Sequence, residues 1–207
     1  MIKKPLFGRK RRENCSIAII INAYYSAPQY IAQSLRLKEE FEKLGATADI
    51  VRNDGFFGRI DNDNIKTYFG NYSACVFLDK DKYLSEMLEM SGITIFNSHK
   101  TIVDCDDKMT TYIRLAGNGV SIPKTLPGLL CYNPYEQIRE QTIAIIENQL
   151  GYPLVVKECY GSQGSGVYPV FDRGQLYSAM ERVKLKPHLI QRMITSSLAK
   201  DVRVIVI

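Results

Sequence analysis

The run at residues 16–22, SIAIIIN, constrains the fold of this chain more than any other feature. Its apolar residues are consecutive and largely β-branched, which is typical of a strand covered on both faces in a parallel sheet. The segments that follow alternate between helices and strands. We expect helices over residues 28–44 and around Leu84 and Leu88, and strands over residues 48–51, 75–78 and 93–96. These elements predict an open-sheet α/β domain over residues 14–97.

The pattern changes after residue 97, where longer helical segments and a glycine-rich loop appear. Met109, Tyr112 and Ile113 predict a helix over residues 104–118. Asn133, Pro134 and Glu136 form a helix start signal, so a second helix is expected from there to Leu150. Asp172 and Gln175 predict the start of a short third helix. Strands are expected over residues 153–157, 167–171, 188–191 and 201–207, which indicates a partial α+β domain.

The positive charge of the chain is concentrated at its N-terminus. The formal net charge is +5, yet six lysines and arginines lie in the first twelve residues, so the other 195 residues carry −1 in sum. We expect residues 1–13 to be a disordered, solvated arm, with binding of an anionic partner as the alternative. A neutral body of this kind does not predict a nucleic-acid partner.

Several classes of protein are not expected. There is no apolar run near 18 residues and no signal-peptide pattern, so we expect no membrane anchor and a cytoplasmic location. The five cysteines form no CxxC pair, and neither His99 nor His188 has a partner at metal-ligand spacing. No metal ligands are therefore predicted among the residues present.

The loop GSQGSG at residues 161–166 is the most suggestive local motif. Glycines let a backbone approach a phosphate closely, so that N–H groups can bind the anion. The loop joins two predicted strands and lacks the GxxxxGK[ST] pattern, which excludes a Rossmann loop and a P-loop. A hairpin turn with no ligand is the alternative. Lys157, just before the loop, and Lys108 could contact a phosphate, although a solvated surface residue is the preferred interpretation of each lysine taken singly.

Two further groups have more than one interpretation. Asp104, Asp106 and Asp107 could form a metal site, but we interpret them as first-turn residues of the helix they begin. Tyr24, Tyr25 and Tyr30 could line a substrate pocket, but partly buried packing residues are the preferred interpretation.

An ordered series of motifs covers about 110 residues, namely GITIFN with Asp107-Lys108, VSIPKT, GYPLVVK with GSQGSGV, LIQ, and Asp201-Val-Arg203. In these motifs the sequence from Asn97 onward resembles the ATP-grasp superfamily, and within it the RimK-like branch of carboxylate-amine ligases. This resemblance implies an N-terminal α/β domain, a first ATP-grasp subdomain over residues 98–186, and the start of a second subdomain over residues 187–207. The reaction it implies uses ATP to join a carboxylate to an amine through an acylphosphate.

The resemblance also implies roles for single residues. Lys108 and Lys157 would contact the ATP phosphates, under a mobile loop formed by Gly161, Ser162, Gln163, Gly164, Ser165 and Gly166. The adenine pocket would be lined by Gln191, Arg192, Met193 and Ile194. Asp201 would lie near the ribose, and Arg203 near the transferred phosphate, as the catalytic residue.

Two departures from the family pattern bear on activity. Arg192 occupies a position where the family usually has an acidic residue. The family's Mg²⁺ ligands, an Asp and then a Glu-x-Asn, follow the Asp-x-Arg strand, and only four residues follow Arg203. We therefore expect the polypeptide and its Mg²⁺ ligands to continue past residue 207, and the chain as given to be inactive.

Two other functions are alternatives to the ligase. The main alternative is a non-catalytic module of a truncated or degenerate ATP-grasp protein that binds a nucleotide or a partner. A dinucleotide-binding protein would need a glycine turn after the first strand, and residues 22–26 contain no glycine. The expected partners are ATP, a small-molecule or peptide carboxylate and an amine such as an amino acid, with a homo-oligomer possible; the sequence does not identify either substrate.

Overall fold

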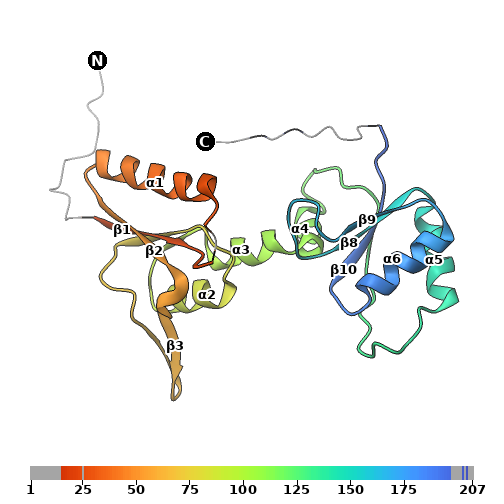
Figure 1. Cartoon of the computed structure of the whole chain (residues 1–207), viewed down its shortest axis with the longest axis horizontal. Coiled ribbons are helices and arrows are strands. Elements are labelled where there is room, and N and C mark those ends of the chain that lie inside the picture. Colours follow the sequence, from red (N-terminus) through yellow and green to blue (C-terminus); the bar gives the residue numbers. More distant parts are fainter. Residues whose placement is uncertain (1–14, 25, 197–201, 203, 205–207) are drawn as a thin grey trace. The chain divides into compact units, whose positions relative to one another are not determined.

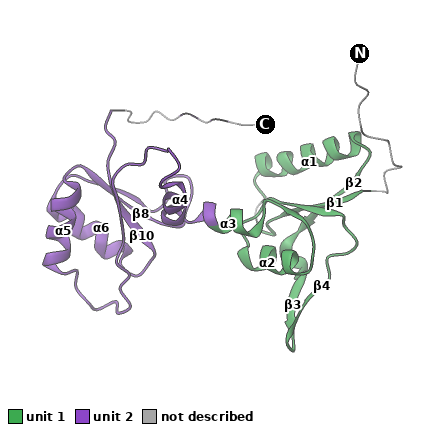
Figure 2. Cartoon of the chain, turned by 180° about the vertical axis from the view of Figure 1, so that it is seen from behind, with its two compact units in different colours: residues 1–103 green, residues 104–207 purple. Residues whose placement is uncertain are grey.

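The structure is a computed structural model that describes residues 15–24, 26–196, 202 and 204. The chain forms two compact units, residues 1–103 and residues 104–207, which are coloured separately in Figure 2. The expected basic arm and the expected strand over residues 201–207 lie outside the described residues, apart from Val202 and Val204. No helix among the described residues is long and apolar enough to cross a membrane.

The first unit is built on a four-stranded parallel sheet, with helices visible around it in Figure 1. Its strand order is β2-β1-β5-β6. The strands are β1 (Ser16–Ile21), β2 (Thr47–Arg52), β5 (Ala74–Phe77) and β6 (Ile95–Phe96), and the helices are α1 (Pro28–Lys43) and α2 (Lys82–Met90). The predicted α/β architecture of this region is confirmed.

Both faces of this sheet are covered. Ile17 and Ile19 of β1 pack with Leu37 and Phe41 of α1 on one face. Ala18 and Ile20 lie in a second cluster that includes Leu84 and Leu88 of α2. Because successive side chains of a strand point to opposite faces, an uninterrupted apolar run is what this arrangement requires.

A small hairpin was missed by the sequence analysis. A 3₁₀ turn (Asn53–Gly55) follows β2, and β3 (Gly58–Asp61) then pairs antiparallel with β4 (Asn64–Thr67). The strands are short and mostly polar, so they lack the apolar signal of the parallel strands.

The interpretation of Tyr24 as a packing residue is also wrong, because its side chain is fully exposed to solvent.

The second unit is built on an antiparallel sheet with the order β7-β10-β8-β9. The strands are β7 (Thr125–Pro127), β8 (Leu154–Glu158), β9 (Val167–Val170) and β10 (His188–Arg192). Two helices, α5 (Glu140–Leu150) and α6 (Arg173–Val183), contribute Ile143, Ile146, Leu176 and Met180 to a core with Leu154, Val156 and Ile190 of the sheet. The α+β prediction is confirmed for this unit.

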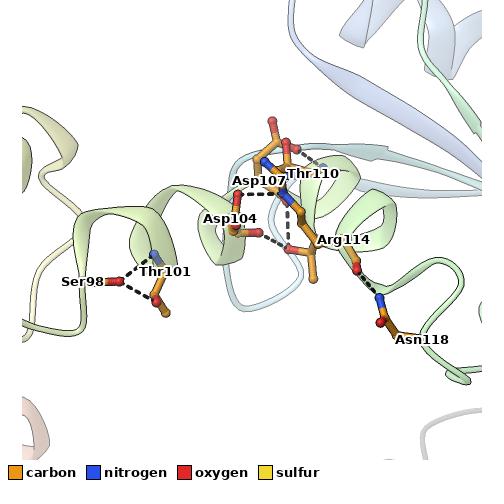
Figure 3. A network of polar contacts seen from close by, with 8 residues as sticks. Ser98, Thr101, Asp104, Asp107, Thr110, Arg114 and Asn118 are labelled. Atoms are coloured by element: carbon orange, nitrogen blue, oxygen red, sulfur yellow. Dashed lines mark hydrogen bonds and ion pairs between the residues drawn. The ribbon is translucent and has the colours of Figure 1, made fainter.

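Two helix predictions in this region are wrong. The helix expected over residues 104–118 is split into α3 (His99–Asp106) and α4 (Lys108–Leu115). Asp107 is the reason, because its Oδ1 accepts from the backbone N–H groups of Met109 and Thr110 and so caps a new helix. Asp104 lies near the end of α3 and pairs with Arg114 of α4 (Figure 3). Asp104 and Asp106 are therefore not first-turn residues.

The second wrong helix prediction concerns Asn133. Its Oδ1 accepts from the N–H of Tyr135 and its carbonyl accepts from the N–H of Glu136, which makes an isolated turn. The helix itself begins at Glu140, seven residues later. The hydrogen bonds of Asn133 thus form a turn, although the same local sequence is also typical of a helix start.

Candidate functional site

Lys157 lies on the face of the second sheet that is opposite α5 and α6. Leu154 and Val156 point into the helix-covered core, so the alternation of the strand places Val155 and Lys157 on the other face. There the Lys157 ammonium donates to Gln191 Oε1 at 2.7 Å. Lys157 Nζ makes no ion pair with a carboxylate among the described residues, so its charge is not neutralised by an acidic side chain.

The side chain of Gln191 is held in one orientation by a chain of hydrogen bonds. It is almost completely buried, and its Nε2 donates to Thr125 Oγ1 at 2.7 Å. Thr125 Oγ1 in turn donates to the carbonyl of Pro123 at 2.7 Å. Because the threonine hydrogen is used in this way, Gln191 must present its carbonyl oxygen to Lys157.

Lys108 is the first residue of α4, directly after the Asp107 cap, and it contacts the start of the glycine loop. Its Nζ donates to the carbonyl of Gly161 at 2.9 Å and to that of Cys159 at 3.3 Å. Its backbone N–H also donates to Cys159 at 3.0 Å. Like Lys157, Lys108 has only neutral acceptors within hydrogen-bond reach in the part of the chain that the structure describes.

The glycine loop joins β8 to β9 as an antiparallel hairpin, as predicted. Four of its six residues have positive φ, namely Gly161, Gln163, Gly164 and Gly166. Gln163 is notable because residues with a Cβ seldom adopt this conformation. Backbone of this kind can present N–H groups to an anion.

Gly166 is required at its position by close packing as well as by its φ of +69°. A Cβ there would lie 2.9 Å from the Glu158 side chain. Glu158 Oε1 accepts from Lys186 Nζ at 2.9 Å and from the Tyr168 hydroxyl at 3.3 Å. The hydrogen bond from Lys186 holds the pKa of Glu158 below its usual value, so this carboxylate is ionised beside the end of the loop.

Cys159, between Glu158 and the loop, is a structural residue. Its side chain is buried, and this burial together with the nearby Asp107 carboxylate raises the pKa of the thiol to about 11. The same two causes raise the pKa of the Tyr160 phenol. Both shifts favour the neutral forms of these side chains.

The segment after β10 has defined backbone contacts. The N–H of Arg192 donates to the carbonyl of Lys124 at 2.9 Å, and that of Met193 to the carbonyl of Pro153 at 3.1 Å. Ile194 is more than half exposed. Asp201 and Arg203 lie outside the described residues, so their roles stay predictions, as do the assignments of the other site residues.

The structure brings Lys157, Gln191 and Thr125 together, and separately joins Lys108 to Gly161. The role of Thr125 was missed by the sequence analysis. Alternation along β8 could have placed Lys157 on the open face, but the pairing with Gln191 depends on a register between strands 34 residues apart in the chain.

Comparison with known proteins identifies the domain that contains these residues. Residues 105–207 match the family model described as the RimK-like ATP-grasp domain. The chain carries a RimK-like ATP-grasp domain. That domain contains both lysines, the glycine loop and Gln191.

Several curated relatives of this RimK-like chain are ligases or synthases. It is 32% identical to human N-acetylaspartylglutamate synthase A over 131 residues, which is 62% of this chain and 32% of that protein. It is 31% identical to the α-aminoadipate–LysW ligase LysX of Saccharolobus solfataricus, over 70% of this chain and 50% of that protein. The glutamate–LysW ligase ArgX of Sulfolobus acidocaldarius is 24% identical, over 92% and 64%. The matched region thus spans about a third of the first relative.

Solved structures extend the similarity in fold to the first unit. A RimK domain ATP-grasp protein from Sphaerobacter thermophilus aligns with a TM-score of 0.63 at 18% identity, covering 87% of this chain and 64% of that one. D-alanine–D-alanine ligase from Bacillus anthracis, complexed with ATP, aligns with a TM-score of 0.60 at 16% identity, over 89% and 58%. These similarities support the α/β and ATP-grasp fold assignment.

Proposed function

We propose that this RimK-like chain belongs to an ATP-dependent ligase that joins a carboxylate to an amine through an acylphosphate. The proposal rests on the charge of the Lys157 ammonium, which is held in place but is not paired with a carboxylate in the described part of the chain. Its ammonium is held on the open sheet face by a neutral, buried amide, and no carboxylate among the described residues neutralises it. A fixed, uncompensated cation is what a phosphate site requires.

Lys108 supplies the second cation. It is tied by hydrogen bonds to the carbonyls of Cys159 and Gly161, so it lies at the base of the glycine loop. The loop, residues 161–166, would cover the phosphates. Gln191 to Ile194 would line the adenine pocket, and Asp201 and Arg203 would lie near the ribose and the transferred phosphate. Mg²⁺ would offset the negative charge of the phosphates, with ligands predicted past residue 207.

The proposed chemistry has two steps. A substrate carboxylate oxygen attacks the γ-phosphorus of ATP, the bond to the β-phosphate oxygen breaks, and ADP leaves. The amine then attacks the acylphosphate carbon, inorganic phosphate leaves with the bonding electrons, and the amine loses a proton to give an amide. The lysines lower the cost of the developing negative charge, and a closed loop would exclude water.

The test is nucleotide affinity in the full-length protein. We expect Lys157→Ala to weaken binding of a non-hydrolysable ATP analogue at least about tenfold, because a charge-assisted contact to phosphate is lost. Isothermal titration calorimetry measures the effect. Lys43→Ala is the matched control, since Lys43 pairs with Glu40 on the surface of α1 in the first unit.

Unchanged affinity in Lys157→Ala would overturn the site assignment. A second measurement, release of ADP in the presence of Mg²⁺, separates the ligase from its alternative. ADP release that requires a carboxylate supports the ligase, whereas tight nucleotide binding without turnover over a panel of carboxylates and amines favours a non-catalytic module.

A further inference from the structure

The first unit contains a cavity of about 340 Å³ that the nucleotide site does not use. It is lined by Ala23 after β1, by Asn53 and Asp54 after β2, and by Asp81 and Tyr83 after β5. In the strand order β2-β1-β5-β6, the strands that follow β1 in the chain lie on both sides of it, so the order of the strands reverses at β1. Ligands of open α/β sheets bind outside the carboxyl ends of the strands at such a position.

A polar network connects the lining residues Ala23 and Asn53 to neighbouring side chains at the strand ends. Asp79 accepts hydrogen bonds from the side-chain amides of Asn22 and Asn53, at 3.2 Å and 2.6 Å. Asn53 Oδ1 accepts from the N–H of Ala23 at 2.8 Å. Three strand ends are thereby tied together, so the cavity does not need to be assembled when a ligand binds.

Aromatic side chains line the cavity without being packed. Tyr24, Phe56 and Tyr83 are 95%, 84% and 67% exposed. Phe56 also has a left-handed backbone, with φ 47° and ψ 51°, which is unfavourable for a residue with a Cβ. Phe56 ends the 3₁₀ turn in this conformation, and no contact among the described residues buries its ring.

The charges on the lining have one sign. Asp54 and Asp81 are its only ionisable side chains of fixed charge at neutral pH, and both are acidic. Asp54 makes no ion pair among the described residues. The ammonium of Lys82, which precedes Tyr83 in α2, lies 5.2 Å from the centre of the Tyr83 ring, so that ring already interacts with a cation.

We propose that this cavity binds a primary ammonium group attached to an aromatic or apolar body, with Asp54 and Asp81 facing the charge and Tyr24, Phe56 and Tyr83 contacting the body. The inference goes beyond the proposed ligase function, because it assigns a second ligand site in the unit that does not contain the nucleotide residues. Carboxylates with aromatic faces are the combination that recognises organic cations.

The experiment titrates the chain with 2-phenylethylammonium at pH 7 and low salt, followed by NMR or calorimetry. We expect saturable binding that is at least about fivefold tighter than that of 3-phenylpropionate, which has the same ring and the opposite charge. Asp54→Asn is expected to weaken amine binding about tenfold, because a charged contact becomes neutral. Equal affinity for the two probes, or no binding of the amine, would overturn the proposal.

A second variant separates a loss of binding from a loss of folding. Phe56→Gly removes the ring and also the left-handed strain, so we expect at least about fivefold weaker amine binding with an unfolding temperature that is unchanged or higher. Ile60→Ala is the matched control, because Ile60 is an exposed apolar residue of β3 outside the cavity lining.

Two further results separate this site from the nucleotide site. Lys157→Ala is expected to leave amine binding unchanged, whether or not it affects the ATP analogue. Amine binding that follows Lys157 and ignores both Asp54 and Phe56 would show that the ammonium site is elsewhere and would refute the proposal.

Discussion

The sheets of the two units leave different surfaces open. In the first unit, apolar clusters cover both faces of the parallel sheet, so the polar groups Asn22, Asn53 and Asp79 gather at the ends of its strands. In the second unit, α5 and α6 contribute to the core on one face of an antiparallel sheet, and Lys157 and Gln191 lie on the other.

The two kinds of sheet can therefore place binding groups at different positions. A parallel sheet covered by crossover helices has only its strand ends available, whereas an antiparallel sheet can use a whole face and its hairpin loops. The two proposed sites follow this rule, with the ammonium site at strand ends and the nucleotide site on a face and a hairpin loop.

The largest expected effect tests whether both faces of the first sheet are equally important. Ile19 and Ile20 are completely buried in different clusters on opposite faces of β1. We expect Ile19→Ala and Ile20→Ala each to lower the free energy of unfolding by about 3 kcal/mol in urea titrations. Ile145→Ala, on the half-exposed side of α5, is the control and should cost less than about 1 kcal/mol. An unchanged free energy of unfolding in either variant would show that the two faces of the first sheet do not contribute equally to stability.

An effect of intermediate size tests the contact between the hairpin loop and Glu158. Gly166→Ala meets both an unfavourable φ and the Glu158 side chain at 2.9 Å, whereas Gly164→Ala meets only an unfavourable φ of +78° in open space. We expect losses of about 2 and about 1 kcal/mol in the free energy of unfolding. Equal losses in thermal or urea unfolding would mean that Glu158 moves away at no cost.

The smallest effect concerns pH. Burial lowers the pKa of His188 in β10, so the unfolded chain binds a proton near pH 6.5 that the folded chain still excludes. Stability should therefore fall as pH drops below 6.5, by at most about 1.4 kcal/mol at pH 5.5, since one pH unit is worth about that much. Urea unfolding of the wild type and of His188→Gln at pH 7.5 and 5.5 measures it. The variant should lack this part of the pH dependence, and an equal dependence in both proteins would contradict the assignment.

The predictable part of the fold was the part with a strong local signal. The uninterrupted apolar run of β1, the Asp172 cap of α6 and the glycines of the loop each determine structure through their near neighbours. The hairpin of β3 and β4 carries no such signal, because its strands GRID and NIKT are mostly polar.

The errors arose where one local signal fits two structures. An aspartate before a helix and an aspartate inside a helix look alike in sequence, and only the bonds of Asp107 show that it begins a second helix. For the candidate site, the lysines and the loop could be named from the sequence. The hydrogen-bond chain through Gln191 and Thr125 could not, because it depends on tertiary register.

The position of α3 has a practical consequence for dissecting the chain. The division between the two units falls between residues 103 and 104, inside this helix, so no loop separates them there. A fragment beginning at residue 104 would lose most of α3 and expose a broken helix end. Asp107, which caps α4 with its own side chain, is a better first residue for expressing the second unit alone.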